Sequence, residues 1–293
     1  MEKIVSSFYK YVKIENPLGL QQDQFDLCNS LNLKGRILLG EEGINGCVYG
    51  VKESIERYKK EIKKNPSFSD MEFKDTVAEK PAYGKLFVRI RKEIVNSSID
   101  VDLNKTGKFL EPKEIKEMLD RNEDLIFVDM RNEYESNIGK FKNAIILPMR
   151  NFRELPEAVK EIENLKDKRI VAYCTGGIRC EKATAYLNEI GFKDVSQIKG
   201  GILKFGEEFP DTYWEGKCFV FDDRLAIQIN KNNNPLTECV WCNKKCDDYA
   251  NCHNLDCDIL FICCDDCKEK HNKSCCEECS KAEKRRKELT LEL

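Results

Sequence analysis

Histidine is scarce in this sequence, and the common dinucleotide signature is missing. The two histidines, His253 and His271, both lie near the end of the chain. A site in which two histidines and one carboxylate hold iron is therefore excluded from everything that precedes His253. No Gly-x-Gly-x-x-Gly motif follows an expected strand, so the sequence contains no flavin or nicotinamide motif of that kind.

Long apolar runs and an excess of one charge are also absent. No stretch approaches the roughly 18 consecutive apolar residues of a membrane-spanning helix, and Met1–Tyr11 lacks the apolar run of a signal peptide. We therefore expect a cytoplasmic protein with no membrane attachment. The 49 Lys and Arg residues nearly balance the 52 Asp and Glu residues, for a formal net charge of -3. This balance argues against a surface coated throughout by nucleic acid, while local basic patches stay open.

Cysteine, by contrast, is abundant. The 293 residues, 41% of them hydrophobic, predict a globular protein of two or three domains. Of the 16 cysteines, eleven lie between Cys239 and Cys279. In a chain without a secretory signal, such a dense cluster favours metal binding over a disulfide framework.

Residues 1–100 alternate strands and helices. Along the first helix, Phe25, Cys28 and Leu31 are spaced to share one face. The order of elements is β-α-β-β-α-β, which predicts a ferredoxin-like domain of one sheet and two helices. The expected strands are Lys3–Ile14, Arg36–Leu39, Asn45–Tyr49, Met71–Thr76 and Leu86–Val95, and the expected helices are Gln21–Leu31 and Ser54–Lys64.

The last strand of this domain has two different faces. Apolar residues at 86, 88, 90 and 94 point one way, and Phe87, Arg89 and Arg91 point the other. A ring and guanidinium groups on an exposed sheet face can stack on bases and bind phosphates. We therefore regard Phe87, Arg89, Arg91 and the following Lys92 as candidate RNA contacts. The alternative is a solvated edge with a half-buried Phe87.

Residues 101–112 are expected to form a linker, and residues 113–215 a domain of a different class. Short apolar strands alternate there with helices, which predicts an α/β domain with a parallel sheet. The strands are 125–128, Arg169–Tyr173 and Val195–Ile198, and the helices are Glu114–Asp120, Glu157–Leu165 and Glu181–Ile190.

A cysteine follows the second of these strands directly, in the segment Cys174-Thr175-Gly176-Gly177-Ile178-Arg179. Open α/β sheets build their sites at the carboxyl ends of the strands. The two glycines let the backbone curl so that several N–H groups face inward. These donors, the next helix N-terminus and Arg179 favour a negative charge on the sulfur. We expect a reactive thiolate, whose persulfide the same groups would hold as an anion; the alternative is a structural cysteine.

The residues around Cys174 resemble the rhodanese family. Asp129–Glu135 is similar to the family's Asp-x-Arg…Tyr-Glu motif at a strand end, and Gly200-Gly201 matches its late Gly-Gly pair. Gly139, Ala144 and Pro148 fit the segment between them, where Lys140, Phe141 and Asn143 depart from the family pattern. The resemblance implies a rhodanese-type fold for residues 113–215.

Further segments resemble one subfamily, the oxygen-dependent tRNA uridine hydroxylases. These segments are Tyr173–Ala183, Gly40–Gly46, Val88–Val95 and Phe219–Arg224, and the likeness extends over nearly the whole chain. It implies conversion of the wobble uridine of certain tRNAs to 5-hydroxyuridine with molecular oxygen and a reductant that the sequence does not identify. The implied partner is tRNA, bound through its anticodon region. The family assigns the role of persulfide intermediate to the residue that matches Cys174.

Cys174 and Arg179 are thus the catalytic candidates. Arg179 is expected to stabilise the sulfur anion or to orient a tRNA phosphate, and Cys180 is either a resolving thiol or a small residue in the first helical turn. A plain sulfurtransferase with a Cys174 persulfide remains the alternative enzyme, and a non-enzymatic RNA-binding protein is disfavoured because Cys174 and Arg179 are retained. The supporting residues are Thr175, Gly176, Gly177, Ile178, Cys180, Asp129 and Arg131.

Residues 216–238 are expected to connect the α/β domain to a small zinc-binding module at 239–280, which is too short and polar to bury an adequate core by itself. Two Cys-x-x-Cys pairs, Cys239 with Cys242 and Cys264 with Cys267, predict one tetrahedral site. The remaining cysteines could hold a second ion, so we expect one or two structural zinc ions in all. The alternatives to zinc are an iron–sulfur cluster and metal-free thiols. The residues competing for the second site are Cys246, Cys252, Cys257, Cys276 and Cys279, with His253 and His271 as weaker candidates.

The chain ends in a charged tail, residues 281–293, which includes Lys284-Arg285-Arg286-Lys287. We expect a solvated helix or a disordered segment, with RNA contact as the lesser alternative.

Overall fold

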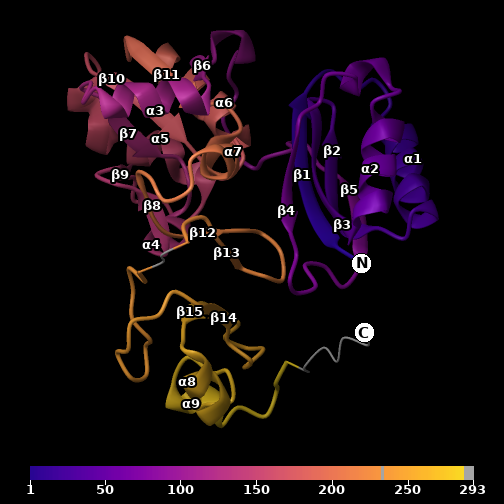
Figure 1. Ribbon diagram of the computed structural model, residues 1–293, viewed down its shortest axis with the longest axis vertical. Helices are drawn as coiled ribbons and strands as arrows, with labels where there is room; N and C mark the ends of the chain where they lie inside the picture. Colours follow the sequence, from indigo (N-terminus) through magenta and orange to yellow (C-terminus); the bar gives the residue numbers. More distant parts are fainter. Residues whose placement is uncertain (232–233, 287–293) are drawn as a thin grey trace.

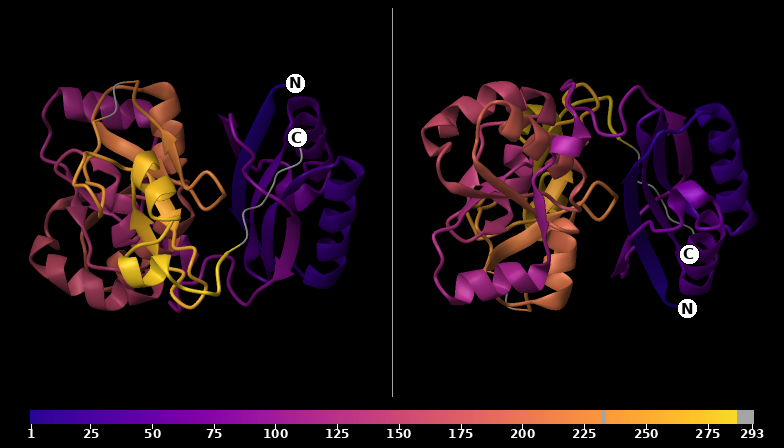
Figure 2. Two further views of the ribbon diagram at one scale, coloured as in Figure 1. Left: turned by 90° about the horizontal axis from the view of Figure 1, so that it is seen from below. Right: turned by 90° about the horizontal axis from the view of Figure 1, so that it is seen from above.

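The computed structural model describes residues 1–231 and 234–286, in which three parts of different architecture follow one another along the chain (Figure 1). The N-terminal and central parts lie side by side (Figures 1 and 2). The C-terminal part contacts the central part, where the Tyr249 hydroxyl donates to the carbonyl of Tyr134 at 2.7 Å. No helix among the described residues is long and apolar enough to span a bilayer.

The N-terminal part is a five-stranded sheet with two helices on one face (Figure 1). Its strand order is β4-β1-β3-β2-β5, and β5 runs parallel to β2 at the edge. This arrangement confirms the ferredoxin-like prediction. The elements are β1 (Lys3–Tyr11), α1 (Pro17–Ser30), β2 (Lys34–Gly40), β3 (Gly43–Val51), α2 (Lys52–Ile62), η1 (Pro66–Phe68), β4 (Phe73–Val77) and β5 (Leu86–Ile90).

The helices cover the apolar face of this sheet. Cys28 and Tyr58 from the helices pack with Ile37 from the sheet in one buried cluster. Phe25, which we expected on one face with Cys28 and Leu31, is 42% exposed, whereas those two residues are buried. Gln24 turns inward instead and accepts a hydrogen bond from the Tyr58 hydroxyl at 2.7 Å.

The opposite face of the sheet carries no helix and is turned toward the central part (Figure 2). Strand register aligns one row of side chains across all five strands. Because side chains alternate along each strand, this whole row points to the uncovered face. The row is Lys74, Ser7, Cys47, Arg36 and Phe87.

The central part is a five-stranded parallel sheet in the order β6-β11-β10-β7-β9, as the alternating pattern predicted. The elements of the sheet and its flanking helices are η2 (Leu103–Lys105), β6 (Lys108–Leu110), α3 (Pro112–Asp120), β7 (Ile126–Asp129), α4 (Glu133–Asn137), β9 (Ile145–Ile146), η3 (Phe152–Glu154), α5 (Leu155–Ala158), η4 (Val159–Leu165), β10 (Arg169–Tyr173), α6 (Ile178–Glu189), β11 (Asp194–Ile198) and α7 (Gly201–Glu208).

Two details differ from the sequence expectations. Residues 108–110, inside the expected linker, form the edge strand β6 beside β11. Helix α6 begins at Ile178 rather than Glu181, so Arg179 and Cys180 stand in its first turn.

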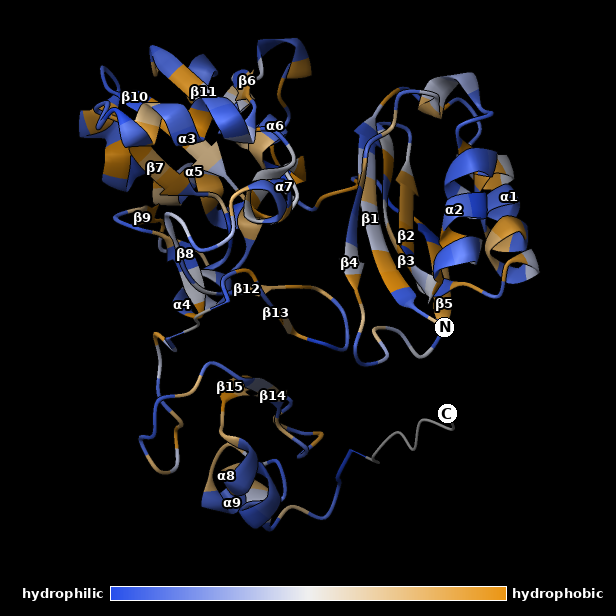
Figure 3. Ribbon diagram, in the orientation of Figure 1, coloured by the Kyte–Doolittle hydropathy of each residue, from blue (hydrophilic) through white to orange (hydrophobic). Residues whose placement is uncertain are grey.

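Helices cover both faces of the parallel sheet, and successive residues of each strand serve opposite faces. Val128 and Ala172 pack with α5 and α6, whereas Phe127, Val171 and Tyr173 pack with α3 and α7. The central strands are accordingly mostly hydrophobic, while two helices of the C-terminal part, α8 (Asp265–Lys270) and α9 (Glu277–Ser280), are mostly hydrophilic (Figure 3).

Much of the expected connecting segment joins the central part through a three-stranded sheet, β13-β12-β8. Beyond it, the C-terminal part has one hairpin and two short helices. These elements are β8 (Gly139–Phe141), β12 (Trp214–Phe219), β13 (Ala226–Gln228), β14 (Tyr249–Asn251), β15 (Leu260–Ile262), α8 (Asp265–Lys270) and α9 (Glu277–Ser280).

The charged tail is described only as far as residue 286, and Lys287 and the residues after it lie outside the described residues. Residues 281–286 form no helix, contrary to one of our two expectations. Arg285 donates instead to the Ser274 hydroxyl at 3.1 Å and to the carbonyl of Cys279 at 3.0 Å, which folds this stretch back on the C-terminal part.

Candidate active site

The Cys174 loop curls between the end of β10 and the start of α6. Gly177 adopts φ +103°, and a Cβ there would lie 2.9 Å from the Tyr9 hydroxyl. Gly201, with φ +65°, brings α7 so close that its Cβ would lie 2.4 Å from the carbonyl oxygen of Cys174. Both positions thus require glycine.

The sulfur of Cys174 is surrounded by hydrogen-bond donors. The backbone N–H of Gly177 donates to Sγ at 3.1 Å. Burial alone would raise the pKa of Cys174, but the Cys180 thiol, the positive charge of Arg179 and the N–H groups of Arg179 and Gly177 lower this pKa to about 5. Cys174 is therefore a thiolate at neutral pH.

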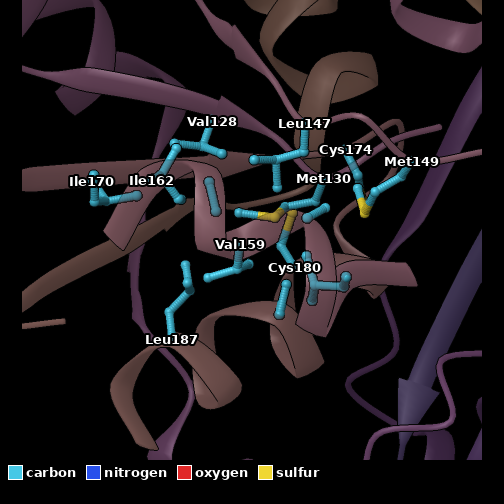
Figure 4. Packing of buried hydrophobic residues seen from close by; sticks show 14 of the residues in the cluster. Val128, Met130, Leu147, Met149, Val159, Ile162, Ile170, Cys174, Cys180 and Leu187 are labelled. Atoms are coloured by element: carbon cyan, nitrogen blue, oxygen red, sulfur yellow. The ribbon is translucent and has the colours of Figure 1, made fainter. Parts of the chain in front are cut away.

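Cys180 is the proton donor of this pair rather than a second thiolate. Both cysteines join the buried cluster between the sheet and α6 (Figure 4). Burial, and then the hydrogen bond to the neighbouring thiolate, raise the pKa of Cys180 far above its ordinary value. Its thiol consequently keeps its proton and offers it to Cys174.

Arg179 turns from the first turn of α6 toward Glu135. Its two terminal nitrogens donate to the carboxylate at 2.5 and 2.9 Å, and it also contacts Thr175 Oγ1 at 3.4 Å. Glu135 is completely buried and fixes the guanidinium beside the sulfur. The sequence indicates Glu135 only as part of the Asp129–Glu135 motif, and its place after Asp129-x-Arg131 is the signal that could have identified it.

Asp129 and Arg131 form a second buried ion pair behind the loop. Arg131 Nε donates to Asp129 Oδ1 at 2.9 Å, and Nη2 donates to Oδ2 at 2.6 Å. The Ser136 hydroxyl donates to the same carboxylate at 2.8 Å, and Arg131 also reaches the carbonyl of Gly139 at 2.6 Å. The pair joins β7 to α4 and β8 and does not touch the sulfur, so its role is to hold the site together.

Breaking this buried pair is expected to destabilise the protein strongly. Arg131→Met leaves Asp129 charged and buried, which typically costs about 3–5 kcal/mol of unfolding free energy. Arg121→Met, which breaks an exposed pair with Glu123, should cost less than about 1 kcal/mol. Urea denaturation of both variants checks this difference; equal midpoints would contradict it.

A cavity of about 440 Å³ opens between the N-terminal and central parts. Cys174 and its loop line one side, and the uncovered face of the N-terminal sheet lines the other. Its volume falls in the range of small-molecule sites. The aromatic side chains of its wall are Tyr9, Tyr83, Phe152 and Phe221, and the basic ones are Arg36, Lys74, Arg153, Arg179 and Arg224.

Polar contacts fix the N-terminal part over the active-site helix. The ammonium of Lys182 on α6 pairs with Glu42 and Glu93, each at 2.9 Å. The Tyr11 hydroxyl donates to the carbonyl of Ile178 at 3.3 Å. The N-terminal part is therefore one wall of the site.

The thiolate state of Cys174 predicts an unusual alkylation profile. Its rate with iodoacetamide should rise as pH increases through about 5 and then stay flat, because only the thiolate reacts. Burial raises the pKa of Cys28 and Cys218 to about 12, so these thiols should stay unlabelled near neutrality. Peptide mass spectrometry over a pH series measures each site, and a Cys174 midpoint above pH 8 would contradict the thiolate.

The candidate RNA contacts lie beside the cavity rather than in it. Phe87 is 39% exposed, and the Arg89 guanidinium lies 4.7 Å from the centre of its ring. Phe87 shares the uncovered face with Arg36, whereas Arg91 and Lys92 follow the end of β5 and are exposed.

The cysteines of the C-terminal part gather into two groups of four. Within each group, all sulfurs lie within 4.8 Å of one another. The first is the predicted set, Cys239, Cys242, Cys264 and Cys267. The second is Cys252, Cys257, Cys275 and Cys279.

Two cysteines chosen from the sequence for the second site stand outside both groups. Cys246 lies elsewhere in the buried cluster, and Cys276 is displaced by its neighbour Cys275. Cys275 lies just before α9 and Cys279 lies within it, with sulfurs 3.7 Å apart. Cys276, the N-cap residue of α9, has an extended backbone, so its side chain points away from that of Cys275.

Both groups fit a tetrahedral metal ion. Zn–S bonds of about 2.3 Å place ligand sulfurs about 3.8 Å apart. The Cys242–Cys264 and Cys257–Cys275 sulfur separations are both 3.7 Å. The buried cluster around the two cysteine groups contains few apolar side chains other than cysteine; Phe261 and Ala250 are two of them.

Three family models match successive segments of the chain. They are the UPF0176 acylphosphatase like domain at residues 3–94, the rhodanese-like domain at 111–208 and the rhodanase C-terminal domain at 215–280. The chain is 44% identical over 275 residues to a protein of Cytophaga hutchinsonii named tRNA uridine(34) hydroxylase, covering 93% of this chain and 88% of the relative. The chain belongs to the tRNA uridine(34) hydroxylase family.

Other hydroxylase-family proteins are equally similar. A protein of Enterococcus faecalis with the same name is 43% identical, covering 96% of this chain and 90% of the relative. Among solved structures, a rhodanese-related protein from Thermoplasma volcanium covers 34% of this chain and 92% of its own, with 26% identity and a TM-score of 0.30. The family membership agrees with the predicted resemblance and with the observed order of domains.

Proposed function

We propose that this protein hydroxylates uridine at position 34 of tRNA to 5-hydroxyuridine, with molecular oxygen as co-substrate and an external reductant. The observation that carries the proposal is a Cys174 thiolate lining an interdomain cavity in a member of the tRNA uridine(34) hydroxylase family. Since its substrate is tRNA, we place the enzyme in the cytoplasm.

The walls of the cavity suit a nucleotide. Aromatic rings stack on bases, and guanidinium groups bind phosphates. Arg36 is exposed at this wall, and Arg224 is held by Asp222 and by the Thr76 hydroxyl, at 2.7 and 2.9 Å. These features support the anticodon loop, where position 34 stands, as the part of tRNA that enters.

The surface around Phe87 and Arg89 extends this binding face, with Arg91 and Lys92 at its margin. Arg89→Ala should weaken tRNA binding several-fold at low salt. It should also make the slope of log affinity against log salt shallower by about one, because about one fewer counterion is released on binding. Filter binding across a salt series measures both quantities. Lys60→Ala on the outer side of α2 is the matched control. Unchanged affinity for Arg89→Ala would remove this surface from the interface.

A sulfurtransferase that carries a Cys174 persulfide is the second candidate. The donors that hold the thiolate, among them Gly177 N–H at 3.1 Å, would equally hold a persulfide anion. Thiosulfate-dependent transfer of sulfur by the purified protein would favour this activity.

We also propose that the two cysteine groups hold structural zinc. Four thiolates close the coordination shell of the ion and leave no open position for substrate. The zinc ions would stabilise the C-terminal part and hence its contact with the central part.

Nucleoside analysis of bulk tRNA tests the main proposal. A strain that lacks the gene should lose 5-hydroxyuridine at position 34, and the wild-type gene should restore it. Unchanged 5-hydroxyuridine in the deletion strain would reject the hydroxylase function, whereas loss of a thiolated nucleoside would support the sulfurtransferase.

A further inference from the structure

Lys74 is a buried lysine on the wall of the active-site cavity. It stands on β4 with only 9% of its surface exposed. In the part of the chain that the structure describes, no hydrogen bond or ion pair engages its amine. The amine lies 4.9 Å from the centroid of the Tyr9 ring, and Glu72, Cys174 and Glu181 act on it only through longer-range electrostatics. A buried amine is costly without a partner, so this position points to a ligand that supplies one.

Lys74 projects into the cavity that contains the reactive sulfur. It lines the cavity together with Cys174 and Gly176, and a Cβ on Gly176 would lie 3.9 Å from Lys74 Cδ. The lysine comes from the N-terminal sheet and the sulfur from the central domain. A substrate held between them would therefore meet a nucleophile on one side and a cation on the other.

Uracil needs such a pair before its C5 atom can react. C5 is a weak nucleophile in the intact ring, because the C5=C6 double bond is conjugated with the C4 carbonyl. When a thiolate adds to C6, the electron pair of this double bond moves through C5 to O4 and leaves an enolate. A cation beside O4 stabilises the charge that develops there.

We propose that the Cys174 thiolate adds to C6 of the target uridine and that Lys74 donates a hydrogen bond to O4 of the resulting enolate. This inference rests on the proposed function and assigns its first step. One bond forms, between Sγ and C6, and the C5=C6 π bond breaks, so no oxidant or reductant is consumed. The enolate carbon C5 then accepts an electrophile, and loss of the C5 hydrogen as a proton, with cleavage of the Sγ–C6 bond, restores the ring and the thiolate.

The charge state of Lys74 gives the step a pH signature. Burial, the largest effect, lowers the pKa of the amine, and nearby charges adjust it. The ammonium is lost as pH rises through this lowered pKa, so catalysis should fall on the alkaline side earlier than for an ordinary lysine. The charged or titratable groups that face the amine are Glu72, Cys174, Glu181, Lys204 and Tyr9.

Hydrogen exchange at C5 isolates the addition from the oxidation. The full-length protein is incubated with substrate tRNA in D₂O under anaerobic conditions, and uridine 34 is analysed by mass spectrometry. Addition at C6 lets C5 take up solvent deuterium, and elimination returns uridine one mass unit heavier. Wild type should exchange this hydrogen, and Cys174→Ser should not.

Lys74 variants test the second half of the proposal. Lys74→Met should slow the exchange about 100-fold, as removal of one oxyanion donor typically does. Its tRNA affinity should match wild type and its Cys174 should still be alkylated as a thiolate at neutral pH, which separates the role from folding, binding and thiolate formation. Lys74→Arg should restore part of the rate and remove the alkaline decline. Lys60→Met, the same change on the exposed outer side of α2, is the control.

The outcomes separate this inference from the proposed function. If wild type forms 5-hydroxyuridine in air but exchanges no C5 hydrogen without oxygen, addition at C6 is overturned while the hydroxylase function stands. If it does not form 5-hydroxyuridine at all, the proposed function itself fails. Exchange at the wild-type rate by folded Lys74→Met, or a loss fully explained by a shifted Cys174 alkylation profile, would overturn the role of Lys74 alone.

Discussion

Replacing Cys174 by serine is expected to reduce 5-hydroxyuridine at position 34 by roughly 10³-fold or more, which is the scale of nucleophile deletions. The loop lowers the pKa of the thiol to about 5, whereas a serine hydroxyl stays protonated in the same place. Serine also cannot carry a persulfide, so a hydroxylation that passes through a Cys174 persulfide would be lost as well. Nucleoside mass spectrometry of tRNA from a complemented deletion strain measures it.

The matched control for Cys174→Ser is Cys28→Ala. Cys28 is buried on the inner face of α1, outside the cavity lining, and keeps its proton because burial raises its pKa to about 12. This variant should leave the modification intact at permissive temperature. Wild-type 5-hydroxyuridine in a strain with Cys174→Ser, at equal protein level, would contradict the thiolate mechanism.

The loop itself was predictable because its chemistry is local in sequence. Cys174, two glycines and Arg179 follow one another directly, and strand and helix periodicity places them at the end of a parallel strand. Glu135 and Lys74 were not predictable in the same way. Each reaches the loop only through tertiary packing, Glu135 from α4 and Lys74 from another domain.

Short or irregular segments limited the fold prediction too. Strand β6 has three residues, too few for an alternating pattern to emerge, and it is stabilised by its neighbour β11 rather than by its own propensity. Phe25 was misplaced because the inward face of α1 includes Gln24, whose polarity hides it from an apolar pattern.

The spacing of the cysteines likewise could not show whether Cys275 or Cys276 belongs to the second group. Spacing alone favoured Cys276 with Cys279 as a Cys-x-x-Cys pair. In the structure, Cys275, just before α9, joins Cys252, Cys257 and Cys279 instead. The backbone at Cys276 is extended, and neighbouring side chains of an extended segment point to opposite sides, so only one of the two faces the common ion.

Removing metal from the C-terminal part is expected to unfold it while the two α/β parts stay folded. Structural zinc sites contribute about 10–16 kcal/mol of apparent binding free energy near pH 7, and most of the buried residues in this part are themselves cysteines. After treatment with a strong chelator, limited proteolysis should cleave the chain within residues 239–286, and the circular dichroism of the remainder should change little. Zinc analysis before treatment should find two ions per chain, one for each cysteine group.

Two adjacent substitutions make this prediction specific to the geometry. Cys275→Ser removes a ligand of the second group and should leave about one zinc per chain, because three thiolates bind the ion much more weakly than four. Cys276→Ser, one position away and outside both groups, should retain two. Equal zinc content in the two variants would contradict the second cysteine group as the structure places it. If both variants retained two ions, Cys275 would be excluded as a ligand.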